Sequence, residues 1–344
     1  MTPQDWQAVQ WDSGCGDGLF ITILYHGKRF HISLLPPNFP DTIEGPLISK
    51  FDSIDDENDD QVLAVQKEIE TIVYETGGSV WTRLAPPVSD GMELSDLHSL
   101  LYPETFPFRF VTNHGKAELI PHQIDEAMYH DRFGMKIVND IGLPQYSSKD
   151  VRVLDTLVGE GYIAKVSVGG KEMCCKSGDD VFWQGIEREF DCLRKVARSH
   201  LVNSIRVPRL FGLITSAETG VIIGILEEYI PTGTLSDLGE LRDEGMEASA
   251  GRIKKWGAEV RETVDLLHEI GVVWGDGKPH NVLIHGDTDE AWLIDFGGSY
   301  THGWVDEHLM ETLEGDEQAV GKILEFLDTV ASTRHNGCND TTRS

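Results

Sequence analysis

Basic residues are scarce in this sequence. Among 344 residues there are 29 Lys and Arg against 58 Asp and Glu, a formal net charge of −29, and the acidic excess is spread over both halves of the chain. Such a surface repels polyphosphates, so neither nucleic acid nor an anionic membrane is expected as a partner. The simplest interpretation of the charge is a solvated acidic surface that keeps the protein in solution.

Cysteines and long apolar runs are also few. The five cysteines form no C-x-x-C pair, and their odd number fits no disulfide framework, which favours a reducing compartment. The longest apolar runs, such as residues 221–226, are too short to cross a bilayer, and residues 1–14 lack the pattern of a signal peptide. We therefore expect a cytoplasmic or nuclear protein.

Residues 1–150 contain no motif that points to a chemistry. Alternating apolar and polar residues at 19–25 and 29–35 predict a β-hairpin, and the six carboxylates within residues 51–60 predict an exposed acidic loop. Apolar residues at helical spacing predict a packing helix over residues 61–76, with the Gly-Gly pair that follows as its stop signal. The expectation is an N-terminal α/β extension.

From residue 151 onward the pattern is more regular. The β-like runs occupy residues 151–158, 162–168, 171–176, 210–215 and 221–229, and the helical runs residues 181–199 and about 247–270. This order predicts an α+β domain, residues 151–335, in which a five-stranded antiparallel sheet with one helix, residues 151–230, precedes a helical part, residues 231–335. A cleft between two such lobes is a common ligand site. The polar residues 336–344 are predicted to form a disordered tail.

A glycine-rich turn begins this second half. Residues 157–166 read L-V-G-E-G-Y-I-A-K-V, which predicts a strand, a turn and a returning strand. Gly159 and Gly161 lack a Cβ, so backbone N–H groups there could approach phosphate oxygens. A Gly-x-Gly pair by itself is more often a plain hairpin turn.

Lys176 ends the third strand, and an acidic partner for it is available on the following helix. Glu189 lies in the middle of that helix, and Glu187 is the alternative. The two carboxylates point about 200° apart around the helix, so at most one of them can face Lys176. The opposing interpretation is a surface lysine beside a solvated helix face.

Two further motifs follow the long helix. Residues 272–284 read V-V-W-G-D-G-K-P-H-N-V-L-I, with Asp276 and Asn281 five positions apart, and residues 291–298 read A-W-L-I-D-F-G-G, with Asp295 after an apolar run. Polar residues flanked by β-like apolar runs can be structural, but so many matched positions are an improbable coincidence.

Together these segments resemble the protein kinase family. The glycine turn resembles the kinase glycine-rich loop, residues 272–284 resemble the catalytic loop H-R-D-x-K-P-x-N, and residues 291–298 contain the D-F-G. The resemblance implies a two-lobe fold that binds ATP and Mg²⁺, with an antiparallel β lobe and a shortened helical lobe.

The resemblance also implies roles at the nucleotide. Gly159 and Gly161 would approach the phosphates, and Val166 would cover the adenine. Lys176 would hold the α- and β-phosphates, with Glu189 fixing its ammonium group.

The remaining roles concern phosphoryl transfer. By the resemblance, Asp276 would orient or deprotonate the acceptor hydroxyl, and Lys278 would neutralise the transferring phosphoryl group. Asn281 and Asp295 would bind Mg²⁺.

Residues 224–235 resemble the segment that links the two kinase lobes. The backbone of Glu228 to Ile230 would then contact the adenine edge. Glu227 falls at the rear of the pocket, where a large apolar residue is commoner, so that end of the pocket is expected to be polar.

The sequence departs from the kinase pattern in several places. Trp274 and Gly275 replace the His-Arg of the catalytic loop, so control by phosphorylation of the activation loop is not expected. No A-P-E follows the D-F-G, and only 23 residues (344 minus 321) follow Gly321. The chain therefore resembles shortened kinase-like proteins with a W-G-D-x-K loop that are frequent in filamentous fungi.

Three functions are compatible with these features. The first is an ATP- and Mg²⁺-dependent phosphotransferase whose acceptor is a protein Ser/Thr or a small-molecule hydroxyl. The second is a pseudokinase scaffold that binds nucleotide, or none, and signals by shape. The third is a kinase fold that carries out another transfer reaction in fungal specialised metabolism. The acceptor, the role of residues 1–150 and the oligomeric state have no signal in the sequence.

Overall fold

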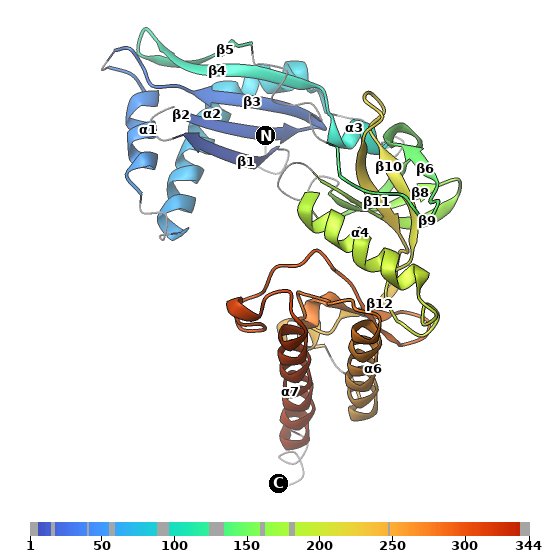
Figure 1. Ribbon diagram of the computed structural model, residues 1–344. Coiled ribbons are helices and arrows are strands. Elements are labelled where there is room, and N and C mark those ends of the chain that lie inside the picture. Colours follow the sequence, from blue (N-terminus) through green and yellow to red (C-terminus); the bar gives the residue numbers. More distant parts are fainter. Residues whose placement is uncertain are drawn as a thin grey trace. The chain divides into compact units, whose positions relative to one another are not determined.

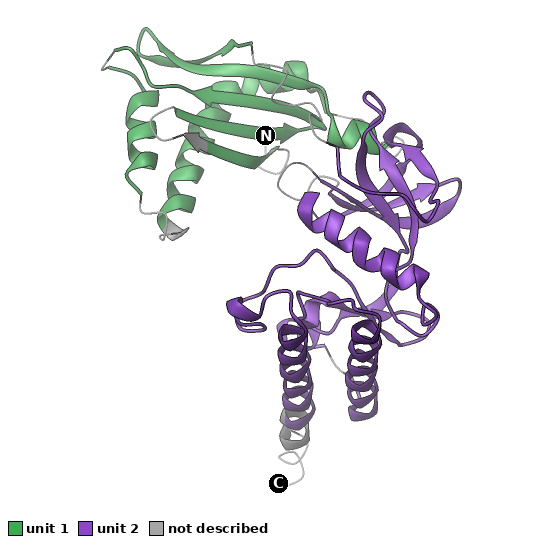
Figure 2. Cartoon of the chain, in the orientation of Figure 1, with its two compact units in different colours: residues 1–130 green, residues 131–344 purple. Residues whose placement is uncertain are grey.

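The chain folds as two compact units, residues 1–130 and residues 131–344 (Figure 2). The computed structural model describes residues 6–14, 18–39, 41–54, 59–87, 96–123, 134–158, 162–178, 183–246 and 248–337. The expected domain boundary lay at residue 150, whereas the described residues 134–150 belong to the second unit. One strand among them, β6 (Gln145–Ser147), is hydrogen-bonded in the sheet of that unit.

The first unit is a five-stranded sheet with helices on one face (Figure 1). The strands in spatial order are β1 (Trp6–Gly14), β2 (Gly18–Tyr25), β3 (Lys28–Leu34), β4 (Thr105–Asn113) and β5 (Lys116–Pro121). The expected hairpin is β2–β3, whose turn residues His26 and Gly27 both have positive φ, as a two-residue type I′ turn requires. Because β3 and β4 are parallel, the chain crosses over between them through helices α1 (Glu44–Asp52), α2 (Asp59–Leu84) and α3 (Leu97–Leu101).

Helix α2 does not stop at the Gly-Gly pair, and that prediction was wrong. A Cβ on Gly77 would lie 2.0 Å from Cε2 of Trp81, so this glycine makes room for the indole one turn later. The Trp81 ring is 2% exposed and packs edge-on against Phe30 at 4.6 Å. A mid-helix glycine costs roughly 1 kcal/mol, which the burial of a tryptophan offsets.

The second unit begins with a six-stranded sheet. In spatial order its strands are β6, β10 (Leu210–Thr215), β11 (Ile222–Glu227), β9 (Lys171–Ser177), β8 (Ile163–Val168) and β7 (Arg152–Val158). The five strands expected from the apolar runs are all present and antiparallel, and the unexpected sixth, β6, joins β10 in parallel. Helix α4 (Trp183–Arg198) packs on β9, β10 and β11 through Ile186, Phe190, Leu193 and Val196, which recur at helical spacing.

A helical part with a small three-stranded sheet follows. Its elements are β12 (Thr232–Asp237), α5 (Glu240–Asp243), α6 (Ala250–Glu269), β13 (Val282–His285), β14 (Ala291–Leu293) and α7 (Leu313–Gly337). Ser249 caps the N-terminus of helix α6, because its hydroxyl accepts from the Arg252 N–H, and the helix lies beside α7 (Figure 1). Helix α7 includes residues 336 and 337, which were expected in the tail, and residues 338–344 lie outside the described residues.

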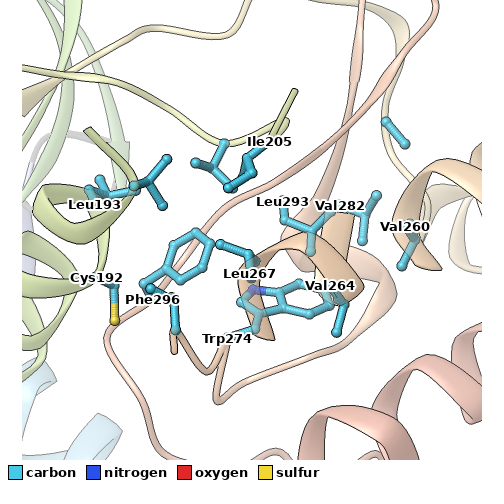
Figure 3. Packing of buried hydrophobic residues seen from close by; sticks show 14 of the residues in the cluster. Cys192, Leu193, Ile205, Val260, Val264, Leu267, Trp274, Val282, Leu293 and Phe296 are labelled. Atoms are coloured by element: carbon cyan, nitrogen blue, oxygen red, sulfur yellow. The ribbon is translucent and has the colours of Figure 1, made fainter. Parts of the chain in front are cut away.

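One hydrophobic cluster joins α4 to the helical part. Figure 3 shows Leu193 of α4 close to Phe296, and Trp274 packed among Val264 and Leu267 of α6. Both aromatic rings are fully buried. The loops that contain the sequence motifs are therefore anchored by core side chains. Among the described residues, no helix is long and apolar enough to span a bilayer.

Candidate functional site

Lys176, at the end of β9, lies between two buried carboxylates. Its Nζ donates to both carboxylate oxygens of Glu189, at 2.6 and 2.7 Å, and lies 3.4 Å from Oε1 of Glu227. Lys176 is 8% exposed and each glutamate 2%. The alternative partner, Glu187, instead accepts the backbone N–H of Lys136. Of the two carboxylates that the sequence offered, the structure brings Glu189 to the lysine.

The charges of this cluster depend on one another. Burial opposes the charged form of Lys176, yet the carboxylates of Glu189 and Glu227 outweigh it and hold the pKa of Lys176 well above its usual range. Burial also raises the pKa of Glu227 to about 8, although the nearby ammonium opposes the rise. The Oε2 atom of Glu227 has no hydrogen-bond partner among the described residues. Glu227 is therefore the member of the cluster that takes up a proton near neutral pH.

Asp276 is held by side chains on three sides. Lys278 Nζ lies 2.7 Å from Oδ2, and the Thr301 hydroxyl donates to Oδ1 at 2.8 Å. Lys278 also donates to the Thr301 hydroxyl at 3.0 Å, which closes a ring of three groups. Asn281 Nδ2 donates to the Asp276 carbonyl at 2.9 Å and lies 3.3 Å from its Oδ2. The carboxylate thus has a fixed orientation with a cation beside it.

The loop before Asp276 is fixed from α7 and from the D-F-G segment. Asp316 is 1% exposed, and its two oxygens accept the N–H groups of Trp274 and Gly275 at 2.8 and 2.9 Å. The indole N–H of Trp274 donates to the Ile294 carbonyl at 2.9 Å. Trp274, at the position where the kinase pattern has a histidine, therefore braces the backbone next to Asp295.

Asp295 has a left-handed backbone conformation, with φ of +64°. Such a conformation strains a non-glycine residue, so the surrounding contacts must hold it. The Ile294 N–H donates to the Asn281 carbonyl at 3.0 Å, and the Phe296 N–H donates to Glu189 Oε1 at 3.3 Å. The charge of Asp295 also contributes to the raised pKa of Lys176. These contacts connect the D-F-G segment to both the loop that contains Asn281 and the buried lysine.

The register of β8 and β9 separates Val166 from the face of Lys176. Val166 pairs with Met173 and is fully buried, whereas Lys165 pairs with Cys174. Because side chains alternate along a strand, Lys165 and Cys174 share the face of Lys176, and Val166 points to the other face. A position of Val166 above the base stays a prediction, and this register argues against it.

The other residues expected at the nucleotide are placed only in part. Gly159 and Gly161 lie outside the described residues. The Glu228 N–H donates to the Arg209 carbonyl at 2.8 Å, so of the Glu228 backbone groups the carbonyl is the candidate for a base contact. Ile230 is buried. The assigned roles of these residues stay predictions.

The comparisons with known proteins match part of the second unit. Residues 157–316 match the family model of the protein kinase domain. The matched segment contains Lys176, Glu189, Asp276 and Asp295 and ends at Asp316, so all the contacts above among these five residues lie within the matched segment.

Three curated relatives match parts of the chain. Protein kinase PVPK-1 of Phaseolus vulgaris is 32% identical over 104 residues, which cover 30% of this chain and 17% of that protein. Serine/threonine-protein kinase OXI1 of Arabidopsis thaliana is 35% identical over 89 residues, covering 26% and 20%. Serine/threonine-protein kinase kin-29 of Caenorhabditis elegans is 28% identical over 137 residues, covering 40% and 15%. Each match spans a fifth or less of the relative's length.

Sequence reasoning missed two residues of this site. Thr301 bonds Asp276, and Arg188 donates to carbonyls on both sides of the site. Arg188 had a usable signal, because it directly precedes Glu189 on an amphipathic helix. Thr301 had none, since it lies in a loop with no periodic pattern.

Proposed function

We propose that this chain is an ATP- and Mg²⁺-dependent phosphotransferase that acts on hydroxyl groups, with Ser or Thr side chains of proteins as the first acceptor class. Glu189 carries the proposal, because it accepts hydrogen bonds from both Lys176 Nζ and the Phe296 N–H. One carboxylate thereby connects the lysine proposed at the phosphates to the segment that presents Asp295. The matched kinase domain supports the reaction class, and the names of two relatives support the acceptor class.

The side chains present fit a nucleotide and its metal. Asp295 and Asn281 offer the hard oxygen ligands that Mg²⁺ prefers, and Lys176 offers an ammonium group already oriented by Glu189. When bound, ATP supplies the phosphoryl group and Mg²⁺ neutralises part of its charge. Under this proposal the ligands would lie between the six-stranded sheet and the helical part, which would be the two lobes of the expected fold.

Asp276 and Lys278 act on the acceptor. The Asp276 carboxylate receives the proton of the acceptor hydroxyl, and its bonds to Thr301 and Asn281 keep it aimed at one position. Lys278 lies 2.7 Å from that carboxylate and places a positive charge where negative charge accumulates during transfer. Because Lys278 also binds Thr301, this charge is positioned before an acceptor arrives.

A pseudokinase scaffold that binds nucleotide weakly or not at all is the second candidate, and Glu227 favours it. Its Oε1 lies 3.4 Å from Lys176 Nζ, so in its ionised form, above its pKa of about 8, Glu227 competes with phosphate for the ammonium group. A lysine shared between two glutamates holds a nucleotide less firmly than a lysine with one.

The test is a phosphotransfer assay with [γ-³²P]ATP, Mg²⁺ and libraries of Ser-, Thr- and Tyr-containing peptides and small alcohols. We expect transfer to a Ser- or Thr-containing acceptor, and about 10²–10⁴-fold less with Asp276→Asn, the range typical for loss of a general base. Asp265→Asn, at an exposed position of α6, is the matched control and should retain full activity. A folded wild-type protein that transfers no more than Asp276→Asn to any acceptor would exclude the phosphotransferase.

A further inference from the structure

Arg188 of α4 connects three backbone segments of the kinase domain. Its Nη1 donates to the carbonyls of Trp274, at 3.2 Å, and Phe296, and its Nη2 donates to the Val273 carbonyl at 3.1 Å. Two of these carbonyls lie just before Asp276, and the third lies just after Asp295. A single guanidinium group therefore holds together the helix that bears Glu189, the catalytic loop and the D-F-G segment.

Gly275 leaves the space that this guanidinium group occupies. A Cβ at Gly275 would lie 2.6 Å from Nη2 and 3.0 Å from Cζ of Arg188. The glycine also has φ of +95°, a conformation that strains any other residue. The residue beside Asp276 is thus matched to an arginine that comes from 87 positions earlier in the chain (275 minus 188). In this fold the two positions are coupled.

The segment after the D-F-G closes over the same arginine. Glu311 accepts the Ser299 N–H at 3.1 Å, and its other carboxylate oxygen lies 3.6 Å from Arg188 Nε. A Cβ on Gly298 would lie 2.9 Å from Cδ of Arg188, so this glycine also permits the close approach. The Glu311 side chain is 43% exposed, so the ion pair itself is weak, and the carbonyl bonds dominate.

We infer that Arg188 is a positioning residue, which keeps α4 docked so that the Lys176–Glu189 pair stays assembled without covalent modification or a partner protein. If α4 moved away, the carbonyls of residues 273, 274 and 296 would lose their donors in a largely buried place, which is unfavourable. The docking of α4 by Arg188 does not depend on whether the protein transfers phosphate. Its consequence for phosphoryl transfer rests on the proposed function.

Hydrogen–deuterium exchange of the full chain, without nucleotide, tests the docking directly. In Arg188→Lys, a change that keeps the charge but removes the planar fork, we expect exchange about tenfold faster in residues 183–198 and 294–299. Gly275→Ala, which displaces the guanidinium group but leaves Arg188 in the sequence, should give the same pattern. Arg194→Lys is the matched control, because Arg194 lies on the same helix and bonds Asp140 and Asp191. It should leave residues 294–299 unchanged.

Unchanged exchange in Arg188→Lys, or equal increases in the Arg194→Lys control, would overturn the inference. The phosphotransfer assay adds a second readout, with protein whose intact mass shows no added phosphate. We expect this unmodified protein to be fully active, with no gain on prior incubation with a kinase, and Arg188→Lys to lower kcat about tenfold. Faster exchange together with an inactive wild type would reject the proposed function and leave the docking intact. An active wild type that first requires phosphorylation would reject the inference alone.

Discussion

Residues 1–130 and residues 131–344 bury titratable groups in different ways. In the first unit, burial and then the charge of Arg29 lower the pKa of His31 to about 4, and its Nδ1 lies 2.9 Å from the Thr22 hydroxyl. Glu44 is 6% exposed and accepts the Thr112 hydroxyl at 2.5 Å. These buried groups bond to neutral hydroxyls, and their contacts connect strands and a helix.

The second unit buries a cation between two carboxylates. Lys176 Nζ lies 2.6 Å from Oε1 of Glu189 and 3.4 Å from Oε1 of Glu227. Buried ion pairs contribute little to stability compared with apolar side chains of the same size. An arrangement of this kind is therefore better explained by chemistry than by folding, and that difference points to the second unit as the place where function resides.

Removal of the buried cation of the second unit should have the largest effect on the free energy of unfolding. Lys176→Met leaves the buried Glu189 carboxylate without its cation, so we expect a loss of about 3–5 kcal/mol in the free energy of unfolding. Urea denaturation of the full chain at pH 7 measures it. Lys254→Met, at an exposed position of α6, should change the free energy by less than about 0.5 kcal/mol. Equal effects of the two substitutions would show that the Lys176 cluster is not buried as described.

The protonation of Glu227 should make the free energy of unfolding depend on pH. Since its pKa is raised to about 8 in the folded chain, the folded state holds a proton that the unfolded state releases near pH 4.5. Stability is lost as the pH rises from about 4.5 through 8. Glu227→Gln should remove this loss and raise the free energy of unfolding at pH 9 by at least about 1.4 kcal/mol, the equivalent of one pKa unit. Denaturation at pH 6 and pH 9 measures it. Glu244→Gln, at an exposed site, is the control and should show the pH dependence of the wild type.

His31 should give the opposite pH dependence in the first unit. Its pKa is lowered to about 4, so the unfolded state takes up a proton below about pH 6.5 and the folded state does not. Its contribution is fully present above pH 6.5 and is lost as the pH falls toward 4. We expect His31→Gln to reduce this acid sensitivity by about 1 kcal/mol. Thermal denaturation between pH 4 and pH 7 follows it, and an unchanged acid sensitivity would show that His31 is not the titrating group.

The brace from Trp274 should have a smaller effect. Trp274→Phe keeps a ring in the core but removes the indole N–H that donates to the Ile294 carbonyl. We expect a loss of about 1 kcal/mol in the free energy of unfolding, the usual contribution of one hydrogen bond. Trp304→Phe, whose ring is partly exposed, serves as control. A Trp274→Phe protein as stable as the control would show that the ring alone matters.

Local patterns in the sequence were sufficient for most strands and helices, because alternation and helical spacing follow from burial of one face. The turn between β8 and β9 is a signal in the sequence that was not used to predict which side chains share a face of the sheet. Gly169 and Gly170 both have positive φ and form a two-residue turn, which pairs Val168 with Lys171 and fixes every later pair. That turn alone places Val166 on the face opposite Lys176. The choice of Val166 came from family spacing, which takes no account of the hairpin length.

Long-range contacts account for what the sequence did not indicate. The pairing of Lys176 with Glu189 could be expected because both lie on regular elements at familiar positions. The approach of Arg188 to the carbonyls around Asp276 depends on the packing of α4 against loops far along the chain, and the continuation of α2 past Gly77 depends on Trp81. No local pattern specifies such contacts.

Calorimetric titration with ATP and Mg²⁺ tests the central claim most directly, because it asks whether Lys176 and Asp295 serve one ligand. We predict saturable binding that requires Mg²⁺, at least about tenfold weaker in Lys176→Met and in Asp295→Asn, and retained in Asp276→Asn. Binding that survives both substitutions, or that is absent from the wild type, would contradict the account.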